Sequence, residues 1–342
     1  MITFMLYLIY ILTISGESIN ARTSTNVGIC YGRLGNNLPS FSQSIQLIKS
    51  MNASSVKIYD ANLDLLHILS GTRLHVSIMI PNQEIRRIAS NQTLADEWVQ
   101  RHVIPFYPRT RIQSILVGNE ILSDSSELGR LLWPSLVPAM QRISTSLRTL
   151  RGHNTRYILV GTPLAMDMLM STFPPSSGAF RPDIRESVME PLLNFLNRTR
   201  SPFFLDVYTY FPWSSDPSNI NLDYALLAQD KNNEYTDPIS GLTYTNLLDQ
   251  MMDSVYFAMG KLGYHDIKLA IAETGWPNSN GRDGFGANIY NAEIYNHNVI
   301  KKMTANPPIG TPARPGEAIQ TYLFSLYDEN RKTGPEVRGI GD

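Results

Sequence analysis

The sequence is poor in the residues that build disulfide frameworks and metal sites. Only one of its 342 residues, Cys30, is a cysteine, so no intrachain disulfide can form and core packing must hold the chain together. Cys30 lies in an apolar run, which predicts a buried thiol without a catalytic role. The six histidines show no ligand spacing such as H-E-x-x-H, so we expect no metal site.

Further absences narrow the functional class. No G-x-S-x-G elbow follows a strand, which disfavours a serine hydrolase, and no glycine-rich dinucleotide loop is present, so we expect no cofactor. The 29 Lys and Arg residues nearly balance the 30 Asp and Glu residues and form no basic stripe. We therefore expect no nucleic-acid partner, whereas an uncharged polymer is compatible with this charge balance.

The first residues form a short apolar stretch. Residues Ile2–Ser15 are followed by small and polar residues, as in a secretory h-region, although no Lys or Arg precedes them. We predict a signal peptide at residues 1–25, with cleavage between about Gly16 and Asn26; a retained anchor is the alternative. No later stretch is long and apolar enough to cross a bilayer. We therefore expect a secreted protein of the extracellular space or cell wall.

Three sequons agree with a secretory route. They begin at Asn52, Asn91 and Asn197, where we expect N-glycans, and such tripeptides also occur by chance. We expect the protein to be a monomer.

Short apolar runs alternate with segments of helical spacing along the whole chain after residue 25. Eight strands with intervening helices predict an α/β fold, a (β/α)8 TIM barrel, as a single domain at residues 26–342. The irregular segment 208–237 is longer than an ordinary loop and predicts a functional excursion. The predicted strands are 26–32, 55–59, 73–80, 112–118, 156–161, 203–208, 267–272 and 319–326. The predicted helices are 41–51 (capped by Ser40), 62–69, 94–106, 134–150, 188–196, 244–262 and 287–303.

Two carboxylates follow predicted strands. Glu273 ends an apolar run and is followed by Gly275 and Pro277, which stop regular structure, so it lies at the end of strand seven. In isolation such a residue could be a surface Glu in an ordinary turn. However, strand four ends in Asn119 and Glu120. Strands four and seven lie across a barrel from each other, so their last side chains can converge as an acid/base pair.

Hydrolysis of a glycosidic bond requires at least two carboxyl groups, which a pair of glutamates can supply. One carboxyl group protonates the leaving oxygen, and the other attacks the sugar or activates water. A separation of about 5 to 5.5 Å predicts retention of anomeric configuration and a wider gap predicts inversion. The sequence leaves this distance open.

Several segments together resemble the plant endo-β-1,3-glucanases of glycoside hydrolase family 17, over about residues 27–332. The resemblance implies a clan-A barrel with catalytic Glu residues at the ends of strands four and seven, β-1,3-glucan as substrate and a retaining double displacement. It implies that Glu120 is the acid/base, Glu273 the nucleophile and Asn119 a ligand of the sugar 2-hydroxyl. Loops such as Gly161–Asp167 resemble the anther callases, which implies callose as the glucan. The matching motifs are Gly28–Gly32, Lys57–Asp60, Gly118–Glu120, Asp206–Phe211, Glu273–Pro277 and Phe324–Asn330.

Aromatic residues fall at or just after the predicted strand ends, where flat rings can meet the apolar faces of glucose units. We expect Tyr31, Tyr59, Tyr208 and Trp276 to bind substrate. For Tyr210, Phe211 and Trp213, packing under loops is an equally good interpretation.

The chain departs from the family pattern at two places. Its C-terminal end is short, and Arg338 falls where a supporting Glu is usual, so we assign Glu329 and Lys332 as supporting residues and leave Glu336 in doubt. Asp206 stands where the family usually has Asn, and a neighbouring carboxylate would raise the pKa values of the two glutamates.

These departures keep other functions open. A mistuned site would give a barrel that binds β-glucan without cutting it. Within the enzymes, a β-1,3-1,4-glucanase or a transglycosylase would share the same carboxylates.

Overall fold

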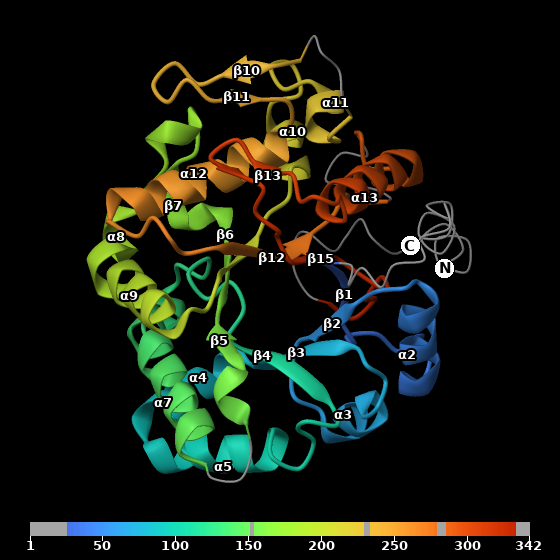
Figure 1. The fold of residues 1–342 in the computed structure, drawn as a ribbon, viewed down its shortest axis with the longest axis vertical. Helices are drawn as coiled ribbons and strands as arrows, with labels where there is room; N and C mark the ends of the chain where they lie inside the picture. Colours follow the sequence, from blue (N-terminus) through green and yellow to red (C-terminus); the bar gives the residue numbers. More distant parts are fainter. Residues whose placement is uncertain (1–25, 151–153, 229–232, 279–284, 333–342) are drawn as a thin grey trace. The chain divides into compact units, whose positions relative to one another are not determined.

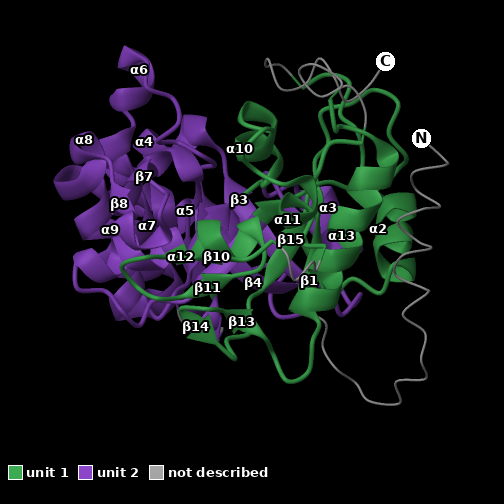
Figure 2. Ribbon diagram, turned by 90° about the horizontal axis from the view of Figure 1, so that it is seen from above, with its two compact units in different colours: residues 1–56, 207–253, 273–342 green, residues 57–206, 254–272 purple. Residues whose placement is uncertain are grey.

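The computed structural model describes residues 26–150, 154–228, 233–278 and 285–332. The predicted signal peptide at residues 1–25 and the C-terminal residues Glu336 and Arg338 lie outside the described residues. The chain divides into two compact units, shown in different colours in Figure 2. Unit 1 comprises Met1–Val56, Val207–Asp253 and Glu273–Asp342, and unit 2 comprises Lys57–Asp206 and Ser254–Ala272.

The main sheet of the described residues has nine strands. The pairs β1·β15, β3·β4, β4·β5 and β6·β9 in this sheet are parallel. The two ends of the strand order, β5 and β6, are separated in the chain by Thr162 alone, so the sheet is nearly closed. Parallel pairing and this near closure confirm the predicted (β/α)8 barrel class. In pairing order the strands are β5 (Leu159–Gly161), β4 (Arg111–Val117), β3 (His75–Ile80), β2 (Ser55–Ile58), β1 (Val27–Tyr31), β15 (Thr321–Leu323), β12 (Leu269–Thr274), β9 (Phe203–Asp206) and β6 (Pro163–Ala165).

The ninth strand, β6, lies just beyond the end of the predicted fifth strand, 156–161. Pro163 has no backbone N–H, so it cannot continue as a donor in the ladder of β5, but it can begin a strand. β5 therefore pairs with β4 up to Gly161, and β6 begins at Pro163 and pairs with β9. The sequence prediction ended at Gly161 and did not include β6.

Helices alternate with the strands as predicted, with some differences at their ends (Figure 1). Ser40 begins α2 with a capping box, in which Gln43 is the reciprocal partner. Asn91 has an extended backbone that ends α4 and caps α5, so α5 begins at Gln92, two residues before the predicted start at residue 94. The helix α4 was not predicted. The helices are α2 (Phe41–Ser50), α3 (Leu63–Leu69), α4 (Ile85–Ser90), α5 (Gln92–His102), α6 (Glu127–Arg130), α7 (Leu136–Thr149), α8 (Pro182–Ile184), α9 (Glu190–Thr199), α10 (Tyr210–Ser215), α11 (Leu222–Ala225), α12 (Leu247–Lys261) and α13 (Ile289–Met303).

In unit 2, α7 packs against α4 and α5 (Figure 1). Its buried residues Leu136, Met140, Ile143 and Leu147 recur at three- and four-residue spacing, which forms one apolar face. None of the helices in the described ranges is both long and apolar enough to span a bilayer.

Short antiparallel hairpins, which sequence patterns do not predict, complete the fold. They are β7 (Leu169–Ser171) with β8 (Ala179–Phe180), β10 (Tyr235–Thr236) with β11 (Thr243–Tyr244), and β13 (Gly310–Thr311) with β14 (Arg314–Pro315). The predicted excursion 208–237 contains α10 and α11. Cys30 is fully buried, as predicted.

Candidate active site

Glu273 is the fifth residue of the six-residue strand β12, and only 5% of its surface is exposed. The Tyr208 hydroxyl donates a hydrogen bond of 2.6 Å to Glu273 Oε2. The backbone is fixed as well, because Val207 N donates to Glu273 O at 2.9 Å. Glu273 therefore has a defined orientation within unit 1.

The turn after Glu273 is packed closely. A Cβ atom on Gly275 would lie 2.5 Å from Phe324 O, so no larger residue fits there. Trp276 is 5% exposed, and its Nε1 donates to Gly286 O at 2.8 Å. Its ring centroid lies 5.3 Å from that of Trp213. This burial favours a packing role for Trp276.

Two aromatic rings of this unit, Phe211 and Phe285, are exposed, and the sequence analysis named only Phe211, with packing as an equally good interpretation. Phe285 is 60% exposed and stacks on Trp213 at 5.4 Å with an interplanar angle of 6°, and Phe211 is 47% exposed and packs edge-on against Tyr208. Sequence reasoning missed Phe285, which follows no strand. Its only signal was the neighbouring Gly286, where positive φ and the closeness of the Trp213 ring require a glycine.

Tyr31 is buried in the core of unit 1. It is 1% exposed, its hydroxyl donates to Ser44 Oγ at 3.0 Å, and its ring packs edge-on against Tyr327. Burial raises the pKa of its phenol. These contacts favour packing over the predicted substrate contact.

The two predicted supporting residues differ in environment. Glu329 is 9% exposed, and its Oε1 accepts a 2.6 Å hydrogen bond from Leu34 N, which fixes the loop after β1. A Cβ atom on Gly32 would collide with the Glu329 carboxylate, so Gly32 gives this carboxylate its space. Lys332 is exposed, and its Nζ lies 4.5 Å from the centroid of the Phe324 ring.

In unit 2, the backbone from Gly118 to Glu120 follows β4 in an unusual conformation. Gly118 has φ +72 and Glu120 has φ +46, a region that residues with a Cβ rarely adopt. The Asn82 side chain bridges both backbone groups of Asn119, with Oδ1 accepting from Asn119 N at 2.8 Å and Nδ2 donating to Asn119 O at 3.0 Å. Glu120 N donates to Pro163 O at 3.0 Å. The Glu120 side chain is half-buried.

Asn119 carries a buried side-chain acceptor. Its Oδ1 is buried and has no hydrogen-bond partner among the described residues. A buried acceptor without a donor is costly, so its retention is typical of a site that receives a donor from a ligand.

Asp206 has a partner that the sequence analysis did not assign. Lys57 Nζ lies 3.9 Å from Asp206 Oδ1, and both side chains are fully buried. Lys57 Nζ also donates to Ala272 O at 3.2 Å and lies 4.8 Å from the centroid of the Tyr59 ring. The charge of Asp206 is thus offset by an adjacent cation. The prediction that Asp206 raises the pKa values of the two glutamates did not take this cation into account. The signal was a Lys within the otherwise apolar strand β2.

The structure therefore groups the predicted residues in three places. Glu273 and Tyr208 are in direct contact in unit 1, Asn119 and Glu120 follow β4 in unit 2, and Tyr59 lies beside the Lys57–Asp206 pair in the same unit. Across the described ranges, no group of three His, Cys, Asp or Glu side chains is arranged to hold a metal ion.

Comparison with known proteins identifies relatives along nearly the whole chain. Residues 27–339 match the model of Glycosyl hydrolases family 17. "Probable glucan endo-1,3-beta-glucosidase A6" from Arabidopsis thaliana is 56% identical over 311 residues, which cover 91% of this chain and 63% of that protein. "Glucan endo-1,3-beta-glucosidase B" from Solanum lycopersicum is 37% identical, with 92% of this chain and 83% of that protein covered.

A solved structure agrees with these relatives. The fold is similar to that of "CJP38, a beta-1,3-glucanase and allergen of Cryptomeria japonica pollen", with a TM-score of 0.83, 38% identity, and coverage of 92% of this chain and 94% of that chain. The chain spans 63%, 59% and 58% of the length of three Arabidopsis relatives that it matches. The match over residues 27–339 shows that the chain belongs to glycosyl hydrolase family 17.

Proposed function

We propose that the protein hydrolyses internal bonds of β-1,3-glucan with retention of configuration, with Glu273 as nucleophile and Glu120 as acid/base. The observation that carries the proposal is the 2.6 Å hydrogen bond from Tyr208 to the buried carboxylate of Glu273 at the end of β12. It holds one carboxyl oxygen in a fixed direction, as a nucleophile requires. The names of the relatives support the substrate class.

The proposed reaction has two displacements. In the first, Glu120 gives its proton to the glycosidic oxygen, the bond from C1 to that oxygen breaks, and Glu273 forms a covalent bond to C1. In the second, Glu120 takes a proton from water, the oxygen of that water bonds to C1, and Glu273 leaves as carboxylate. Two inversions at C1 give net retention, and both glutamates return to their starting states.

Asn119 and the aromatic residues supply the proposed substrate contacts. The buried Oδ1 of Asn119 accepts a hydrogen bond from the sugar 2-hydroxyl, which satisfies an acceptor that has no donor among the described residues. Tyr59, Tyr208 and the half-exposed Phe211 offer rings to glucose faces. Glu329 and Lys332 support the site through the loop after β1 and the Phe324 ring.

The route and location of the protein are part of the same proposal. We infer secretion to the cell wall, with callose as the natural glucan. The three sequon asparagines Asn52, Asn91 and Asn197 are all exposed, which is compatible with N-glycans. Asn91 caps α5 through Oδ1, and a glycan attaches at Nδ2, so capping and glycosylation are compatible.

The test is digestion of laminarin and of reduced β-1,3-gluco-oligosaccharides by the purified protein. Glu120→Gln should lower kcat by about 10² to 10⁴ fold, the usual contribution of general acid/base catalysis. Glu273→Gln should abolish turnover, and Glu186→Gln, an exposed matched control, should leave it unchanged.

The products decide among the alternatives. Proton NMR during the reaction supports retention if the first product to form has the β configuration. Linkage analysis of the products separates hydrolysis of β-1,3 bonds from β-1,3-1,4-glucanase or transglycosylase activity. Tight glucan binding without any product would favour a binding barrel, and unchanged turnover in Glu273→Gln would refute the assignment of the nucleophile.

A further inference from the structure

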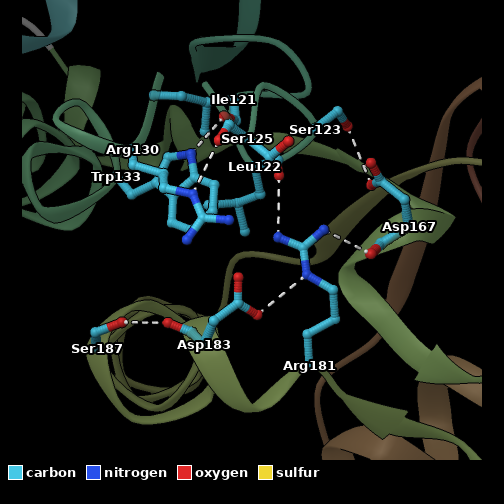
Figure 3. A network of polar contacts seen from close by, with 10 residues as sticks. All are labelled: Ile121, Leu122, Ser123, Ser125, Arg130, Trp133, Asp167, Arg181, Asp183 and Ser187. Carbon is cyan, nitrogen blue, oxygen red and sulfur yellow. Dashed lines mark hydrogen bonds and ion pairs between the residues drawn. The ribbon is translucent and has the colours of Figure 1, made fainter. Parts of the chain in front are cut away.

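A polar network around Arg181 includes the backbone that follows Glu120 (Figure 3). Arg181 Nη2 donates to Leu122 O at 3.1 Å, and its Nη1 donates to Asp167 O at 2.9 Å. Its Nε lies 3.3 Å from Asp183 Oδ1. One planar guanidinium thus joins three segments of unit 2: the loop after β4, the turn after β6, and the start of α8.

The loop after β4 requires such support. Glu120 has φ +46, and a side-chain-bearing residue persists in this region only where its surroundings fix it. Ile121 and Leu122 are 2% and 1% exposed, so their carbonyl oxygens need donors from within the protein. Trp133 Nε1 donates a hydrogen bond to Ile121 O at 2.9 Å, and Arg181 Nη2 donates one to Leu122 O.

Arg181 is itself held in place. Its side chain is 22% exposed, and its Cζ lies 5.7 Å from the centroid of the Trp133 ring. Ser123 Oγ donates to Asp167 Oδ1 at 3.0 Å, which gives a second link between the same two segments. Because these contacts restrict the guanidinium, it acts as a fixed template for the loop.

We propose that Arg181 is a positioning residue that sets the direction of the Glu120 carboxyl group through the backbone of residues 121–123. The inference rests on the proposed role of Glu120 as acid/base. Arg181 itself touches no reacting atom in this proposal. Its loss should therefore impair proton transfer specifically and leave the attack by Glu273 largely intact.

The test compares two leaving groups. An oligosaccharide leaving group needs a proton from Glu120, whereas 2,4-dinitrophenolate leaves without one, and kcat/KM reports this first step for both substrates. For Arg181→Met we expect kcat/KM to fall about tenfold on laminari-oligosaccharides, equivalent to the loss of one or two ordinary hydrogen bonds. On 2,4-dinitrophenyl β-laminaribioside the fall should be less than about threefold by the same reasoning.

Two further variants bracket this result. Arg181→Lys keeps the charge but cannot donate to both carbonyls in fork geometry, so it should show the same pattern with a smaller effect. Arg130→Gln is the matched control, because Arg130 stacks on the same Trp133 ring at 5.4 Å but donates to Ser125 O. It should keep wild-type values on both substrates.

Glu120→Gln separates the inference from the proposed function. If that variant shows no dependence on the leaving group, the proposed function fails. If Glu120→Gln shows it but Arg181→Met behaves like Arg130→Gln, or loses both substrates equally, the inference is overturned. Amide hydrogen exchange of residues 119–123 gives a readout that is independent of activity. Exchange should be faster than in the wild type in Arg181→Met and unchanged in Arg130→Gln. Equal protection in the two variants would also overturn the inference.

Discussion

The buried pair of Lys57 and Asp206 provides a quantitative test of the core of unit 2. Both side chains are fully buried, with Nζ 3.9 Å from Oδ1, and Lys57 also donates to Ala272 O at 3.2 Å. Removal of one partner from a buried ion pair costs about 3 to 5 kcal/mol, because a charge is then buried without its counterion. We expect Asp206→Asn to lower the free energy of unfolding by about 3 kcal/mol on this basis. Lys57→Met should cost about 1 kcal/mol more, because Ala272 O also loses its donor.

The double variant of Lys57→Met and Asp206→Asn is the decisive measurement. It buries no unpaired charge, so it should be only about 1 to 2 kcal/mol less stable than the wild type, the cost of one unsatisfied carbonyl. The assay is urea unfolding followed by tryptophan fluorescence, with equal m-values as the condition for comparing variants. Single-variant losses that add within about 0.5 kcal/mol would refute the reasoning, since independent sites add to this accuracy.

Three further predictions concern activity and stability. Tyr208→Phe removes the hydroxyl that donates to Glu273, and the loss of this hydrogen bond should lower kcat/KM on laminarin about 10- to 100-fold. It should also lower the free energy of unfolding by about 1 to 3 kcal/mol, because the buried carboxylate loses a donor; an unchanged rate would contradict this. Burial raises the pKa of Asp253 from 3.8 to about 7. Between these pH values the unfolded chain binds fewer protons than the folded chain, so the free energy of unfolding falls as pH rises from about 4 to about 7. Asp253→Asn should therefore gain on the order of 3 kcal/mol relative to the wild type between pH 4 and pH 7.5 in urea unfolding, and an equal difference at both pH values would contradict the shift. Ser40→Ala removes the capping box of α2 and should cost about 1 kcal/mol, whereas Ser50→Ala, at the exposed far end of the same helix, should cost less.

The order and type of the main elements could be predicted from the sequence because long periodic segments are strong signals. Ser40 was identified as a cap, and the alternation of apolar runs with helical segments gave the barrel class. The predicted fifth strand ended correctly at Gly161, but the three-residue strand β6 that follows Thr162 was not predicted, because so short a run carries no periodicity. Hairpins of two-residue strands carry no periodicity that a sequence pattern could detect.

The site shows the same division. The motifs around Glu120 and Glu273 could be placed at strand ends from glycine and proline signals alone. The burial of the aromatic rings could not be predicted from these signals. It separates Tyr31 and Trp276, at 1% and 5% exposure, from the more accessible Tyr208. Whether a ring at a strand end faces solvent depends on tertiary neighbours, which local sequence does not encode.

Asp206 shows how a single position can mislead without its partner. Its departure from the usual Asn implied an added negative charge, but Lys57 lies 3.9 Å away and compensates it. Two polar residues in two apolar strands were each visible in the sequence. Their pairing became visible only once β2 and β9 were placed in one sheet.

The two carboxylates are held by different means, and this difference predicts where distant mutations will act. Glu273 lies within a regular strand, so the strand pairing supports its backbone, and Tyr208 donates a hydrogen bond to its carboxylate. Glu120 lies outside its strand at positive φ, so its direction depends on side chains that satisfy the surrounding backbone, among them Asn82 and Arg181. Changes remote from the chemistry should therefore impair proton transfer by Glu120 more often than attack by Glu273. A library of substitutions, screened on leaving groups of different pKa, would reveal this as an excess of variants whose defect disappears with dinitrophenolate.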